Sequence, residues 1–191
     1  MSQVPSDLDA LADAVPKAVI LAPTFLADAS SRDPLRVSAW HPRRKMFAVA
    51  GDREITHAVA AMLPRIAVPA SERSVLANAA RTMPFMAELV VQRGDWRALS
   101  RNLHRPARAA SEAVTAVVGS RSSRSLPVLA RPALASVSAL APFDFRAYAA
   151  SHFTRHADQI VAMLDAWRNL RPAIPTPALD DLHGVLTEAI R

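Results

Sequence analysis

Apolar residues recur at helical spacing through much of the chain, and the clearest early example lies between residues 71 and 94. Its stripe consists of Val75, Leu76, Ala79, Ala80, Met83, Ala87, Val90 and Val91. Ser71 is placed to cap the start of this helix, and Gly94 to stop it. Because proline has no main-chain N–H to donate, Pro84 is expected to kink or divide the helix.

The strongest helical pattern follows Asp144, which is the expected N-cap, and ends before Pro172. Its apolar face consists of Phe145, Tyr148, Ala149, Phe153, Ile160, Leu164 and Trp167. A last helix presents Leu179, Leu182, Leu186 and Ile190. Shorter helices are predicted over residues 6–15, 54–63, 96–104 and 107–118.

The first third of the chain is less helical. Residues 17–27 are apolar but ambiguous between a buried strand and a short helix. Two β-prone segments, 35–40 and 45–50, flank the turn-like "HPRR" and end at "GD". This stretch resembles the first two strands of a WD-type propeller blade. A propeller needs repeated blades and no second copy occurs, so an isolated hairpin is predicted.

These patterns together predict a mainly α protein. We expect an irregular bundle of six to eight short helices, with one small β-hairpin near residues 35–50. Residues 1–191 are expected to form a single domain, and 120–125 ("SRSSRS") a flexible loop. Abundant alanine and only four glycines agree with a helical fold.

Composition narrows the possible functions. The absence of cysteine excludes disulfides, thiol catalysis and cysteine-bound metals. No apolar run reaches the length of a membrane span, and the first residues do not resemble a secretory signal or transit peptide, so we expect a soluble, intracellular protein. The net charge of +6 is concentrated in residues 73–131, where ten arginines face three acids.

Motifs for catalysis are missing. The chain has neither a G-x-S-x-G nucleophile motif nor a glycine-rich phosphate loop, and many carboxylates stand at helix starts. A non-catalytic protein without a cofactor is therefore expected. His152 and His156 are four residues apart and could share a metal if Asp144 or His183 supplied a third ligand. Both lie on or beside an apolar stripe, so we expect core histidines and no metal.

The remaining candidate chemistry is a run of arginines at Arg93, Arg97, Arg101, Arg105 and Arg108. On one continuous helix these five would span 120° of arc, opposite Trp96, Leu99 and Leu103. Gly94 and Pro106 limit the regular helix, which makes Arg97 and Arg101 the secure pair. The run is either a surface that holds anions or the solvated side of an ordinary helix.

The function predicted from this pattern is an interaction or assembly protein. Its arginine-rich helical surface would hold an anionic partner, either an acidic protein or a nucleic-acid backbone. The alternative is a nucleic-acid-binding regulator or packaging factor with weak sequence specificity, since no aromatic residues alternate with the arginines to stack on bases. A small α-helical enzyme of unrecognised type is the third possibility.

Overall fold

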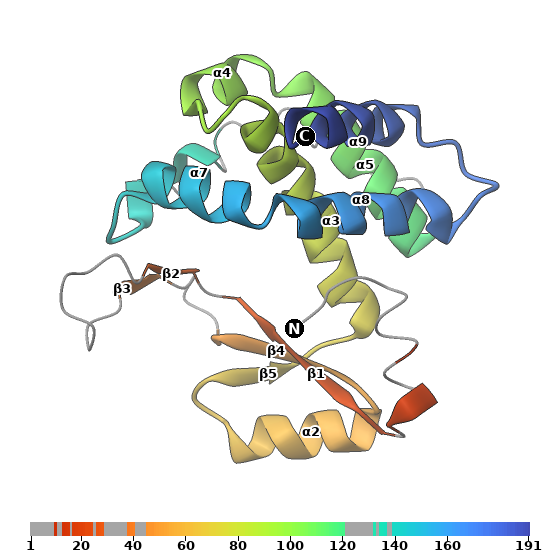
Figure 1. The fold of residues 1–191 in the computed structure, drawn as a ribbon. Helices are drawn as coiled ribbons and strands as arrows, with labels where there is room; N and C mark the ends of the chain where they lie inside the picture. The colour runs from red at the N-terminus through yellow and green to blue at the C-terminus, as the bar shows by residue number, and fades with distance from the viewer. Residues whose placement is uncertain are drawn as a thin grey trace.

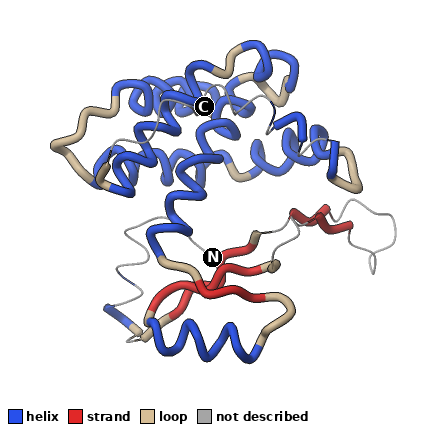
Figure 2. The backbone as a smooth tube through the Cα atoms, turned by 180° about the vertical axis from the view of Figure 1, so that it is seen from behind, coloured by secondary structure: helices blue, strands red, loops and turns tan. Residues whose placement is uncertain are grey.

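The computed structural model describes residues 10, 13–15, 17–24, 26–28, 38–40, 45–120, 132, 134–136 and 139–191. Within these ranges the fold is mainly α, as predicted. A bundle of helices lies to one side of a small β-sheet, and a single long helix runs from the sheet into the bundle (Figure 1). Viewed from behind, the three-stranded sheet and the helix beneath it lie at the far end of the long helix from the bundle (Figure 2).

The bundle is built around one central helix. Its members are α3 (Glu72–Val91), α4 (Trp96–Arg101), α5 (His104–Val118), α7 (Phe145–Arg155), α8 (Ala157–Leu170) and α9 (Pro177–Ala189). Residues 84–90 of α3 are all buried, and α5, α7, α8 and α9 pack around that half of the helix. Pro84 is inside α3 and does not divide it, because burial of this whole segment stabilises the helix against the lost hydrogen bond.

Short polar side chains set the helix starts, as the sequence indicates. Ser71, Asp95 and Asp144 each accept main-chain N–H groups at the N-termini of α3, α4 and α7. The predicted break at Pro106 is wrong in position. Pro106 lies in the first turn of α5, where a missing N–H costs no intrahelical bond, so α5 begins at His104 and α4 ends at Arg101.

The helix predicted after Asp144 is two helices. His156 ends α7 and precedes α8, with φ −108° and ψ 25° outside the helical range. The apolar face nevertheless continues across the break, because Ala149, Ile160 and Trp167 are all buried in the same core. The break at His156 leaves the buried face intact, so the spacing of apolar residues in the sequence gives no sign of it.

The sheet corrects the prediction of an isolated hairpin. Strand β1 (Val19–Pro23) pairs antiparallel with β4 (Phe47–Gly51), and β4 pairs parallel with β5 (Ala67–Pro69). Strand β3 (Ser38–Trp40) pairs instead with β2 (Leu26–Asp28). The apolar sequence of β4 suits a central strand covered on both faces, and the ambiguous segment 17–27 supplies its antiparallel neighbour.

Two helices cover the sheet. Helix α2 (Arg53–Met62) connects β4 to β5 and packs on one face, where Val49 is fully buried (Figure 1). On the other face Ile20, Ala22, Ala48 and Ala50 surround Val75 from the first turn of α3. Helix α3 therefore belongs to both hydrophobic clusters.

Some predictions fall on residues outside the described ranges. These are most of the N-terminal helix over 6–15, the "HPRR" turn, and the 120–125 loop beyond Ser120. Among the helices that are described, none is both long enough and apolar enough to cross a membrane.

Candidate anion-binding surface

The five arginines of the sequence pattern lie where α3 turns into α4 and α4 into α5. Arg93 and Gly94 both have positive φ, at 53° and 79°, and reverse the chain after α3. A side chain at Gly94 would place its Cβ 2.8 Å from the Cβ of Ala150 in α7, so the turn packs tightly against the bundle. Asp95 then caps α4, accepting from the amides of Arg97 and Ala98 at 2.8 and 3.1 Å.

Four of these arginines are exposed. Arg93, Arg97, Arg101 and Arg108 form the arginine surface, and none of them makes an ion pair with a carboxylate of the described residues. Arg97 and Arg101 are one helical turn apart on α4, as predicted. Guanidinium groups without an internal partner keep their donors available to an outside anion.

Two acids lie close enough to the arginine surface to interact with it: Asp95 before α4, and Glu112 of α5, whose pKa is raised mainly by burial and is lowered in part by the charge of Arg108. The amides of Ala98 and Arg97 hold the pKa of Asp95 below its ordinary value, and the charges of Arg101 and Arg97 lower it further. The Asp95 carboxylate therefore stays ionised at neutral pH and offsets part of the positive charge of α4. Its bonds to the helix end mark it as a cap rather than as a partner for a particular arginine.

Arg105 is different from the other four. Its guanidinium makes two bonds to the Glu88 carboxylate, Nε to Oε2 at 2.7 Å and Nη2 to Oε1 at 2.9 Å. Glu88 is fully buried on α3, and it also accepts from Gln92 and Asn102. These bonds to Glu88 raise the pKa of Arg105. Asp181 of α9 lies 3.9 Å from the same guanidinium, so Arg105 ties α5 to α3 and α9.

The helical periodicity does not reveal the role of Glu88. A signal was present, because Glu88 is the only charged residue in the apolar run from Pro84 to Val91. A carboxylate inside a buried helix segment needs a cationic partner. Arginines on both sides of Glu88 in the sequence could supply one, but the sequence alone does not say which of them turns inward.

The opposite side of α4 faces the core, as predicted. Trp96, Leu99 and Leu103 are buried, and the Trp96 ring meets Phe145 of α7 edge to face at 5.4 Å between centroids. Trp96 is therefore not available to stack on a base. The arginine surface offers charge and hydrogen-bond donors without an aromatic platform.

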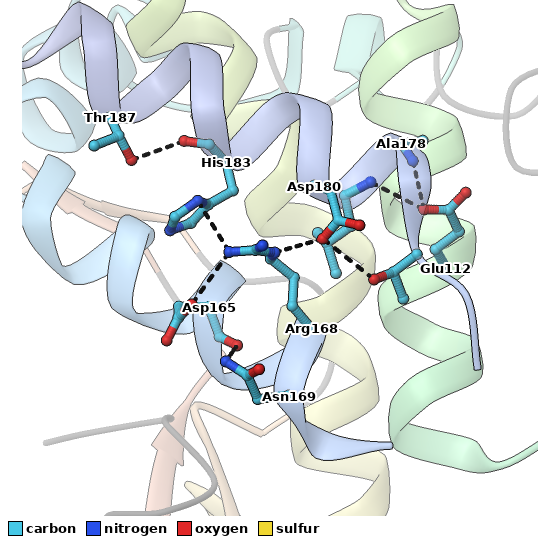
Figure 3. A network of polar contacts seen from close by, with 10 residues as sticks. Glu112, Asp165, Arg168, Asn169, Ala178, Asp180, His183 and Thr187 are labelled. Carbon is cyan, nitrogen blue, oxygen red and sulfur yellow. Dashed lines mark hydrogen bonds and ion pairs between the residues drawn. The ribbon is translucent and has the colours of Figure 1, made fainter. Parts of the chain in front are cut away.

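A second polar network lies between α5, α8 and α9 (Figure 3). Arg168 of α8 donates to Asp180 of α9 at 2.5 Å and to Asp165 at 3.2 Å, and it contacts Nδ1 of His183 at 3.2 Å. Glu112 of α5 accepts from the amides of Ala178 and Leu179 at 2.8 and 2.9 Å. These contacts join helices to one another, and the carboxylates of the network already accept hydrogen bonds within it.

The histidine pair lies at the junction of α7 and α8, where His152 is half-buried; the expectation of core histidines is wrong for His156, which is exposed because it lies at the break between the two helices. The rings of His152 and His156 are 4.8 Å apart between centroids, and His152 also stacks on Tyr148. Burial, followed by the nearby charges of His156 and Arg155, lowers the pKa of His152. No three metal-ligating side chains gather anywhere in the described ranges. The two proposed third ligands have other partners, since Asp144 caps α7 and His183 contacts Arg168.

Comparisons with protein families, with characterised proteins and with solved structures give no match to this chain.

Proposed function

We propose that the protein is a non-catalytic interaction protein that holds an anionic partner on its arginine surface. The observation that carries this proposal is the contrast among the five arginines. Arg105 is neutralised by a buried acid, while Arg93, Arg97, Arg101 and Arg108 are exposed and form no ion pair within the described ranges.

The geometry favours contact with a charged backbone or an acidic surface over recognition of bases. Guanidinium groups bind phosphate and carboxylate oxygens through paired N–H donors. Trp96, the aromatic residue of α4, is buried in the core and cannot stack on bases. Binding to nucleic acid through such a surface would be backbone-directed and weakly specific.

The experiment compares the wild type with the quadruple variant R93Q/R97Q/R101Q/R108Q. Both are used to capture partners from an extract of the native host, with and without nuclease, over a range of salt concentrations. We expect the variant to lose the partner and keep its melting temperature, and the wild type to release the partner as salt rises. If the partner is a nucleic acid, nuclease removes it, and each lost phosphate contact lowers the slope of log affinity against log salt by about 0.9.

A matched control removes the same charge elsewhere. R65Q/R73Q/R81Q/R191Q changes four other exposed arginines and should retain the partner. Equal loss in the two quadruple variants would mean that net charge alone governs binding. Unchanged binding in the first variant would show that the arginine surface is only a solvated helix side, and would refute the proposal.

A further inference from the structure

Helix α7 lies at one end of the bundle and buries little of its surface (Figure 1). Only Phe145 and Ala149 of its 11 residues are buried, whereas α8 buries five residues in 14. Between the two helices His156 leaves the helical range, so α8 begins a helix of its own. Because the free energy of local opening depends on the apolar contacts that a segment buries, α7 can separate from the bundle while α8 stays in place.

Four rings form an aromatic cluster at this break: Tyr148, His152 and Phe153 of α7, and His156. The Tyr148 and His152 rings stack with their centroids 5.1 Å apart. The Phe153 and His156 rings lie 5.0 and 4.8 Å from the His152 ring. His152 is half-buried and His156 is exposed. Protonation of His152 therefore places a charge in a partly buried position, beside a second ring that also takes up a proton.

No carboxylate of the described residues offsets this charge. Burial lowers the pKa of His152, and the charges of His156 and Arg155 lower it further. Neither histidine of the aromatic cluster forms an ion pair with a carboxylate in the described ranges. The acids of α7 and of the helices that contact it have other partners or are exposed: Glu88 pairs with Arg105 and Asp165 with Arg168, Asp95 and Asp144 cap helices, and Glu72 and Asp158 are exposed.

We propose that the α7–α8 junction is an acid-sensitive hinge, which releases α7 from the bundle when the histidines of the aromatic cluster protonate. Release exposes the His152 ring to water, where a histidine binds a proton near pH 6.5. Below that pH the open form therefore binds more protons than the closed form, and acid shifts the equilibrium towards the open form. Opening also uncovers Trp96 and the turn at Gly94, against which Phe145 and Ala150 of α7 pack. The hinge is independent of whether the arginine surface holds a partner.

The test is amide hydrogen exchange of the full-length protein at pH 7.5 and pH 5.5, expressed as protection factors so that the intrinsic pH dependence of exchange cancels. We expect the amides of α7 to be less protected than those of α5 and α9 at both pH values. Their protection should fall about three- to tenfold at pH 5.5, since uptake of one proton changes an opening equilibrium by at most tenfold per pH unit. Low urea should change it little, because release of one helix exposes less surface than unfolding does.

Matched variants separate the hinge from global unfolding. H152F keeps a ring to stack on Tyr148 but cannot protonate, so α7 should lose most of its pH dependence; H152Q, which also cannot protonate, should give the same result. H183Q removes a histidine of α9 that stays in place when α7 opens, and should leave the response of α7 unchanged. The proposal is overturned if α7 is as protected as α5, if its protection is equal at the two pH values, or if both His152 variants respond to pH as the wild type does.

Discussion

The buried carboxylate of Glu88 gives Arg105 a structural role that the other four arginines do not have. Its carboxylate is fully buried and is satisfied by the guanidinium of Arg105 together with the amides of Gln92 and Asn102. Separating a buried carboxylate from its cation leaves a charge in a medium that solvates it poorly. Arg105 is thus part of the fold, whereas Arg101 one helix earlier faces solvent.

We expect R105Q to lower the free energy of unfolding by about 3 kcal/mol, because Glu88 then keeps its burial without its ion pair. Urea denaturation at neutral pH measures this loss. The matched control R101Q removes an exposed arginine and should change stability by no more than about 0.5 kcal/mol. The double variant E88M/R105M should recover most of the loss, since an apolar pair needs no compensation. Equal stability of R105Q and R101Q would contradict this assignment.

At the scale of elements, the sequence predicts helices and caps, which depend on residues close together in the chain. It does not predict strand pairing, which depends on residues far apart in the chain. The last helix was predicted well, since Leu179, Leu182 and Leu186 are all fully buried. The caps at Ser71 and Asp95 were predicted because they act within three residues. Strand pairing was not, because β4 takes its partners from segments on either side of it along the chain.

The start of α9 shows the same distinction. Thr176 precedes the helix but makes no side-chain cap bond, and the capping carboxylate comes from Glu112 on α5. A separation of more than 60 residues in sequence hides this cap from any local pattern. The negative charge at a helix N-terminus also suits the helix dipole, although burial raises the pKa of Glu112.

We expect E112A to lower the free energy of unfolding by about 1 kcal/mol, the usual effect of losing a helix cap. E112Q should lose less, since its amide oxygen can still accept. Hydrogen exchange should show faster exchange at the amides of Ala178 and Leu179 in E112A. The exposed Glu188 near the other end of α9 provides the control, and E188Q should leave both amides protected. Unchanged exchange in E112A would mean that α9 starts without this cap.

For the whole molecule, two histidines link stability to pH. Burial lowers the pKa of His152 in α7, and burial together with the charge of Arg168 lowers the pKa of His183 in α9. In the unfolded chain histidine protonates near pH 6.5, so below that pH the unfolded state binds more protons than the folded state. Stability must therefore fall as the pH drops through 6.5, and level off once the folded histidines are also protonated.

The expected result is a lower urea midpoint at pH 5.5 than at pH 7.5. In H152Q/H183Q this difference should shrink, because the variant removes two of the groups that take up protons on unfolding. Single variants should each remove part of it. A double variant with the same pH dependence as the wild type would show that acids, and not these histidines, control the response in this range.

Helix α3 also sets the distance between the small sheet and the arginine surface. It begins after Ser71, close to the end of β5, and it ends next to Arg93, the first member of the arginine surface. A helix of 20 residues is about 30 Å long. Because its second half packs in the bundle core and its first turn packs against the sheet, the helix fixes how far apart these two parts of the molecule lie. A ligand shorter than this separation cannot contact the sheet and the arginine surface at the same time.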